Sequence, residues 1–174
     1  GDATAKTIAD SLRGNSTVLR VLYISTNNIG PEGGKAIGEM MRVNVEMQDL
    51  NIASNHIGDA GAVAIAGALK VNPSMYKLSL RLNEIRDAGA IAIAEALAVN
   101  KVLVEFYCGG NHYSQDAKQK LKDSVEGRPD REGRPVDPYA PTKGGRGPVP
   151  FNAPHPDALP ALSLMERTVR EHDL

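Results

Sequence analysis

The sequence is poor in cysteine, in aromatic residues and in long apolar runs. Its 174 residues include one cysteine, Cys108, which excludes an internal disulfide framework and a zinc cluster built on cysteines. Tryptophan is absent, and five tyrosines and two phenylalanines are the only aromatic residues, so a core must be built from Leu, Ile, Val and Ala. No apolar run reaches the roughly 18–20 residues of a membrane span, and no charged and then apolar signal segment opens the sequence.

Neither sign of charge predominates. The chain has 20 Lys and Arg against 21 Asp and Glu. The balance holds in both parts of the chain, with 13 basic and 14 acidic residues up to residue 126 and seven of each beyond it. Because phosphate neutralisation needs an excess of basic side chains, we expect no nucleic acid among the partners.

What the sequence does contain is a repeat of 28 residues. Asparagine recurs at this spacing in two series, and apolar residues recur at the same spacing in five more. Seven series at one period indicate a repeat architecture. The asparagine series are Asn27, Asn55, Asn83 and Asn111, and Asn44, Asn72 and Asn100.

Each repeat has two phases. Between residues 47 and 55, Leu50 and Ile52 lie two residues apart, which is the period of a strand with one buried face. Between residues 59 and 69, apolar residues recur at i, i+3, i+4 and i+7, which is one stripe of an α-helix. The sequence therefore predicts a strand and a helix in every repeat.

Polar residues flank the predicted helices. Asp59 and Asp87 fall at helix starts, where we expect each carboxylate to accept the unpaired N–H groups of its own first turn. The second asparagine series falls at helix ends, and Asn tolerates the left-handed conformation that often terminates a helix. We therefore predict left-handed backbone at Asn44, Asn72 and Asn100.

Four segments in register share one motif: LRVLYISTNNIG at 19–30, MQDLNIASNHIG at 47–58, MYKLSLRLNEIR at 75–86 and LVEFYCGGNHYS at 103–114. The motif resembles the pattern L-x-x-L-x-L-x-x-N-x-L/I of the leucine-rich repeat family, in its ribonuclease-inhibitor-like subtype. The last copy departs from the pattern, with Phe106 and Cys108 at leucine positions. The resemblance covers roughly residues 2–126 and implies an α/β leucine-rich repeat solenoid. Such a fold is a short horseshoe with parallel strands on its concave face and helices on its convex face.

We divide the chain into three parts. Residues 1–126 form the solenoid, with a half repeat, four repeats and a charged last helix that caps the end. Nine of the eleven prolines lie beyond it, so 127–160 are predicted to be an extended arm. Residues 161–174 are predicted to be a short amphipathic helix that begins with a capping box. The arm docks either on its own solenoid or on another subunit.

The first part of the chain, residues 1–15, matches only the helical half of a repeat, with Asp2 where Asp59 stands later. Either the sequence is a fragment of a longer repeat protein, or this helix is a cap. In the second case the strand near residues 19–24 is an open sheet edge, at which another chain could pair.

The concave face is the usual binding surface of a solenoid. Tyr and Arg are enriched at interface hot spots, which favours a protein-binding role, although the row Asp49, Lys77 and Glu105 can equally pair with itself across neighbouring strands. The predicted contact residues on the concave face are Tyr23, Asp49, Asn51, Lys77, Arg81, Glu105 and Tyr107. Those predicted on the C-terminal arm are Tyr139, Phe151, Leu162, Met165 and Val169.

No group of residues indicates catalysis, a cofactor or a metal. We predict that the ladder Asn27, Asn55, Asn83 and Asn111 is structural, because a turn asparagine can bond the backbone of neighbouring turns. His56 and His112 should lie roughly 10 Å apart, too far for one metal. Cys108 should point inward, and a shallow solenoid offers no water-excluding pocket. We expect no enzyme.

Two functions remain open. The first is a non-enzymatic scaffold subunit of a larger multiprotein assembly, intracellular and cytoplasmic or part of an organelle or cilium assembly. The second is a regulatory domain. The resemblance implies it, because ribonuclease-inhibitor-like repeats occur in activators of Ran-type small GTPases and in innate-immune sensors. Those relatives carry more repeats, and the GTPase activators an acidic tail that this sequence lacks.

Overall fold

The computed structural model describes residues 1–13 and 19–126. The predicted arm at 127–160 and the predicted helix at 161–174 lie outside the described residues. The same holds for the contact residues predicted there, Tyr139, Phe151, Leu162, Met165 and Val169.

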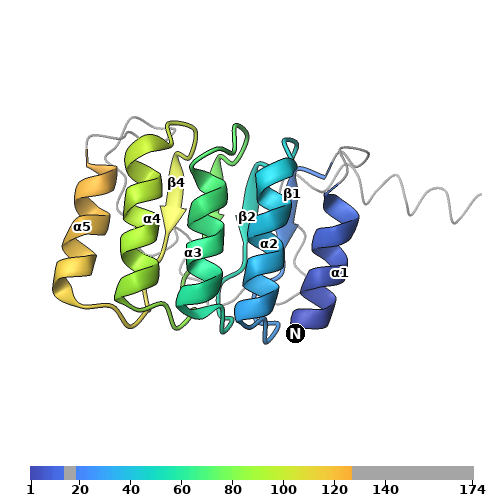
Figure 1. Ribbon diagram of the computed structural model, residues 1–174, viewed down its shortest axis with the longest axis horizontal. Coiled ribbons are helices and arrows are strands. Elements are labelled where there is room, and N and C mark those ends of the chain that lie inside the picture. The colour runs from blue at the N-terminus through green and yellow to red at the C-terminus, as the bar shows by residue number, and fades with distance from the viewer. Residues whose placement is uncertain (14–18, 127–174) are drawn as a thin grey trace, which may run out of the picture. The chain divides into compact units, whose positions relative to one another are not determined.

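Helices and strands alternate along the described chain, in two layers (Figure 1). The helices lie side by side in one layer, and the strands form the other. No helix within the described ranges is long and apolar enough to cross a membrane. The elements are α1 (Asp2–Leu12), β1 (Val21–Tyr23), α2 (Pro31–Val43), β2 (Asp49–Asn51), α3 (Gly58–Leu69), β3 (Lys77–Ser79), α4 (Asp87–Val99), β4 (Glu105–Tyr107) and α5 (Gln115–Val125).

The four strands form a parallel sheet in the order β1-β2-β3-β4. Residues 28 apart in the sequence are exact neighbours in the sheet, so Leu22 lies opposite Leu50, and Leu78 lies opposite Phe106. The predicted fold class, a leucine-rich repeat solenoid of parallel strands and helices, is confirmed. The period of the sequence is thus the register of the sheet.

The core lies between the two layers. Leu50, Leu78 and Phe106 of the strands are buried against Ile65 and Leu97 of the helices. Leu22 and Ile24 of the first repeat are only partly buried, although they occupy the same register. The reason is that β1 has a strand on one side only among the described residues.

Small residues let neighbouring helices pack closely. A Cβ atom placed on Gly38 of α2 would lie 2.7 Å from the carbonyl carbon of Ala64 in α3, which no real side chain tolerates. The same construction on Gly67 of α3 meets nothing nearer than 3.6 Å. Gly38 is therefore required by the helix contact, whereas Gly67 is not.

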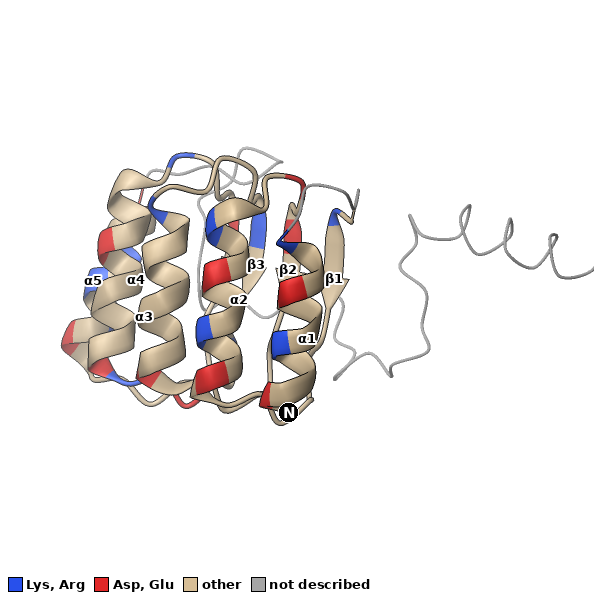
Figure 2. Ribbon diagram, turned by 45° about the vertical axis from the view of Figure 1, so that its right-hand side comes forward, with Lys and Arg blue, Asp and Glu red and all other residues tan. Residues whose placement is uncertain are grey.

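The aspartates at the helix starts cap the next helix rather than their own. Asp2 Oδ1 accepts the N–H of Gly30 at 2.5 Å, at the start of α2. Asp59 Oδ1 accepts the N–H of Arg86 at 2.8 Å, at the start of α4, while α3 itself has no side-chain cap. The prediction that Asp59 and Asp87 cap their own helices is wrong. These residues lie inside the first turn, one or two places past the N-cap position, and their carboxylates reach sideways along the edge where all helices begin (Figure 2).

The prediction of left-handed backbone at the helix ends is also wrong. Asn44 has φ −80° and ψ 120°, and Asn100 has φ −70° and ψ 128°, which are extended conformations. Their side chains make the terminating hydrogen bonds instead. Asn72 Nδ2 donates to the carbonyl oxygen of Met41 at 2.5 Å, in the preceding helix, and its Oδ1 accepts the N–H of Met75 at 2.7 Å.

Asn44 and Asn100 bond in the same way, so the second asparagine series is a buried ladder in its own right. Asn44 Nδ2 donates to Leu12 O at 2.7 Å, and Asn100 Nδ2 donates to Leu69 O at 2.7 Å. We call Asn44, Asn72 and Asn100 the helix-end ladder. It joins the end of each helix to the end of the helix before it.

Candidate functional site

The strands expose one face to solvent, opposite the helices. We call it the open sheet face; it corresponds to the predicted concave face. The register places its residues in two rows, Val21, Asp49, Lys77 and Glu105, and then Tyr23, Asn51, Ser79 and Tyr107. The structure thus brings six of the seven predicted contact residues together on these strands, and the seventh, Arg81, follows β3 by two residues.

The charged row pairs with itself. Lys77 Nζ lies 3.2 Å from Glu105 Oε2 and 3.9 Å from Asp49 Oδ2. Tyrosine hydroxyls close both ends of the row: Tyr23 donates to Asp49 Oδ2 at 2.7 Å, and Tyr107 donates to Glu105 Oε2 at 3.3 Å. Of the two roles that the sequence left open for these charges, the structure displays the internal one.

Lys77 stays charged in this setting. Its partial burial by itself lowers the pKa of the ammonium, but the carboxylate of Asp49 and the hydrogen bond to Glu105 act in the opposite direction. The net result is a pKa above the ordinary value of a lysine. One cation between two carboxylates leaves the row with a single excess negative charge.

The first strand carries the most accessible apolar surface of this face. Leu19 is 39% exposed, Val21 44% and Tyr23 40%, whereas Asp49 and Glu105 are half-buried. This side of the face therefore offers an aliphatic and aromatic contact area beside a neutralising ionic row. Large apolar and aromatic side chains in such a position are typical anchors for a protein partner.

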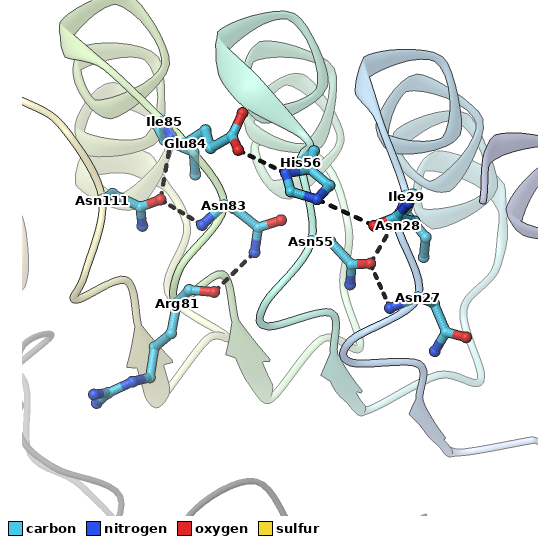
Figure 3. A network of polar contacts seen from close by, with 10 residues as sticks. All are labelled: Asn27, Asn28, Ile29, Asn55, His56, Arg81, Asn83, Glu84, Ile85 and Asn111. Atoms are coloured by element: carbon cyan, nitrogen blue, oxygen red, sulfur yellow. Dashed lines mark hydrogen bonds and ion pairs between the residues drawn. The ribbon is translucent and has the colours of Figure 1, made fainter.

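Three further positions of this face have local roles. Ser79 differs from the prediction of a solvent-facing residue, because it is only 6% exposed, a short side chain between its register neighbours Asn51 and Tyr107. Asn51 Oδ1 accepts the N–H of Ala53 at 3.0 Å, which shapes the turn after β2. Arg81 is half-buried, and its side chain points away from the asparagines of the turns (Figure 3).

The asparagines that follow the strands form a second ladder, in which alternate steps differ (Figure 3). Asn55 Oδ1 accepts the N–H groups of Asn27 at 2.9 Å and Ile29 at 3.0 Å. Asn111 Oδ1 binds the turn before it in the same way, at 2.8 and 3.1 Å. Asn83 donates through Nδ2 to Ile52 O and Arg81 O, but its Oδ1 is buried with no hydrogen-bond partner among the described residues.

The alternation originates in the backbone of the turns. Asn28 and Glu84 have positive φ, 54° and 59°, in the first and third turns. In the second turn the positive φ, 58°, is at Gly58 instead, and the N–H of His56 donates to Ile29 O at 2.7 Å. The N–H of His112 makes the equivalent bond, to the carbonyl of Ile85, at 2.8 Å in the fourth turn. The true structural period of the turns is therefore two repeats.

The titratable turn residues are exposed and do not form a metal site. His56 Nδ1 lies 2.6 Å from Glu84 Oε1, and its Nε2 lies 3.2 Å from Asn28 Oδ1. His112 is exposed on the fourth turn. Within the described ranges no three His, Cys, Asp or Glu side chains gather as metal ligands, and Cys108 is a buried free thiol.

A small open hollow of ≈ 70 Å³ lies between α1 and the first turn, lined by Thr4, Ile8, Ile24, Asn27 and Ile29 among others. Its walls are mostly aliphatic. It brings together no acid, base or nucleophile, so its chemistry is that of apolar contact.

Comparison with known proteins places the fold. Residues 15–38, 44–66 and 71–94 match a family model described as "Leucine Rich repeat". A solved structure titled "Leiomodin-1 Actin-Binding Site 2 (ABS2)" is similar with a TM-score of 0.62 and 22% identity, over 67% of this chain and 69% of that one. The tropomodulin C-terminal domain of Caenorhabditis elegans is similar with a TM-score of 0.63 and 16% identity, over 71% of this chain and 77% of that one. No curated protein matches the sequence. At these identities the structural matches show a shared fold.

Proposed function

We propose that this chain, which belongs to the leucine-rich repeat proteins, is a non-enzymatic protein-binding module. The observation that carries the proposal is the open sheet face. It joins an exposed aliphatic and aromatic area at Val21 and Tyr23 to a row of charges that Lys77 neutralises from within. Such a surface suits a partner that buries apolar side chains and makes polar contacts at its rim.

The finer proposal is a scaffold subunit of a larger assembly. The solenoid supplies a rigid face, because each repeat is tied to the next through Asp59-type caps and two asparagine ladders. The Pro-rich segment at 127–160 is proposed to add a second contact area. An assignment to the ribonuclease-inhibitor-like subtype rests on the 28-residue spacing, which the family model does not specify.

Actin is the first partner to test. The leiomodin structure that resembles this fold is described as an actin-binding site, and this resemblance is what supports the choice. Purified chain would be sedimented with filamentous actin and, separately, titrated with labelled monomeric actin. Wild-type binding that Val21→Glu abolishes and Val63→Glu preserves would support the open sheet face as the actin site. Val63 is a matched control, since it is 47% exposed and lies on α3, in the helix layer.

The general proposal is tested independently of actin. A photoreactive amino acid is introduced at position 21 or at position 63, and cross-linked proteins are identified after irradiation in cells. We expect discrete partners at position 21 that are absent at position 63. Identical patterns from both positions would contradict the proposal for this face, whatever the actin assay gives.

A regulatory role stays a prediction from the family resemblance. It would be tested by measuring GTP hydrolysis of Ran-type GTPases with and without the chain. Faster hydrolysis would favour it over the scaffold.

A further inference from the structure

We propose that the edge of the solenoid where the helices end is a second docking surface, which takes an acidic amphipathic α-helix of a partner protein. The surface is defined by four exposed valines, Val43, Val45, Val71 and Val99, and we call it the valine edge. It is separate from the open sheet face, and it rests on the proposed function only in requiring that the chain binds proteins.

The valines recur with the repeat. Val43 and Val99 are the last residues of α2 and α4, and Val71 follows α3 by two residues. They are spaced by 28 residues and are 49%, 59% and 61% exposed for Val43, Val99 and Val71. Val45, just after α2, adds another side chain that is 43% exposed. Isolated exposed valines need no explanation, but the same apolar residue exposed in each of three adjacent repeats forms a continuous row.

The polar groups next to the row are already satisfied. The last helix carbonyls accept the side-chain amides of the helix-end ladder, as Met41 O does from Asn72. Lys70 pairs with Glu95 at 3.5 Å, and Arg13 pairs with Glu39. A partner therefore meets apolar side chains without having to strip hydrogen bonds from the backbone beneath them.

The remaining charges at this edge are mostly basic. Arg42 precedes Val43, Lys101 follows Val99 by two residues, and Arg20 precedes β1 at the same edge. These three cations make no ion pair with another described residue, and one acidic residue, Glu46, lies among them. Blue segments at the upper ends of α2 and α3 and in a neighbouring loop mark this edge in Figure 2. The charge that complements it is negative.

The spacing selects the shape of the partner. Neighbouring packed helices lie about 8–10 Å apart, which is the spacing between successive valines. A helix presents side chains on one face every seven residues, about 10.5 Å apart, and so can meet successive valines with successive heptads. An extended strand repeats on one face about every 6.7 Å and falls out of step at once. A polyproline helix repeats every 9.3 Å or so, but its usual receptors are lined with aromatic rings, and this row has none.

The test uses a fluorescein-labelled synthetic helical peptide of about 24 residues. It carries leucine at its fourth, eleventh and eighteenth positions, with glutamate beside each leucine. A control peptide has the same composition with the leucines spread around the helix, and a third is a proline-rich peptide. Binding to the full chain is followed by fluorescence anisotropy for the wild type, Val71→Glu, Val63→Glu and Val21→Glu.

We expect the heptad peptide to bind the wild type more tightly than either control peptide, and added salt to weaken it. Val71→Glu removes an apolar contact and adds a like charge, so affinity should fall about tenfold or more. Val63→Glu and Val21→Glu should leave it unchanged.

Equal binding of the scrambled peptide, preference for the proline-rich peptide, or equal loss in Val71→Glu and Val63→Glu would overturn the proposal. Loss in Val21→Glu alone would also overturn it, since the peptide would then occupy the open sheet face. Failure of the actin or cross-linking assays leaves these outcomes unaffected. Circular dichroism and the urea midpoint of each variant show that the fold is retained.

Discussion

The helix-end ladder makes a quantitative prediction about Asn72. The side chain is 3% exposed and makes hydrogen bonds in both directions. Replacement by alanine leaves the carbonyl of Met41 and the N–H of Met75 without partners inside the core. Each orphaned buried group costs about 1–3 kcal/mol, so Asn72→Ala should lower the free energy of unfolding by about 3 kcal/mol. Domains have only about 5–15 kcal/mol in total.

Asn27→Ala is the matched control. Asn27 is exposed, and its Nδ2 donates to the nearby carbonyl of Ser25 at 2.8 Å. The same substitution there should change stability by no more than about 0.5 kcal/mol. Urea unfolding is followed by circular dichroism. With a slope near 2 kcal/mol per molar, the Asn72→Ala midpoint should fall by about 1.5 M while the slope stays constant. Equal midpoints for the two variants would refute the reasoning that the helix-end asparagines hold the repeats together.

Three further substitutions test packing, capping and titration. Gly38→Ala should lower the melting temperature, because its Cβ would meet the backbone of α3 at a cost of about 1–3 kcal/mol, whereas Gly67→Ala should raise it through a gain of about 0.5–1 kcal/mol; shifts of the same sign would contradict the packing argument. Asp59→Ala should cost about 1 kcal/mol in thermal unfolding, and Asp59→Asn, which keeps the accepting oxygen, should cost less; an equal cost would argue against the cap. Asp87 accepts hydrogen bonds from Ser114, chiefly from its backbone N–H, which lowers the pKa of the Asp87 carboxyl. The folded-state pKa is then the lower one, so the advantage of the wild type over Asp87→Ala, measured by urea unfolding at stepped pH, should be constant at neutral pH and shrink as pH falls below about 4; an advantage that grows in acid would reverse the sign.

Much of the fold follows directly from residue spacing. The pair Leu50 and Ile52, repeated every 28 residues, predicts a strand whose buried face is fixed, because a register slip of one residue would turn every leucine to solvent. The same period predicts that Asp49, Lys77 and Glu105 are neighbours, as they are. Spacing could not decide whether the three pair with one another or with a partner.

The remaining contacts depend on the distance between repeats, which no local pattern encodes. Asp59 looks like a cap of its own helix, yet its carboxylate lies nearer to the N–H groups of the next one. Asn72 looks like a left-handed helix terminator, yet its amide spans the gap to Met41. Gly58 and Glu84 look unrelated in the sequence, and only the backbone shows that their turns alternate. A 28-residue series hides a period of twice its length.

This alternation limits how the chain can be lengthened or shortened. Excision of 28 residues would set two turns of the same kind next to each other, and the oxygen of Asn111 would then face a turn that already donates to backbone carbonyls. Excision or duplication of two consecutive repeats leaves every turn beside the kind of neighbour it has now. The natural building block for grafting this solenoid onto another, or for growing it, is therefore a tandem of repeats, although the leucines alone would allow single ones.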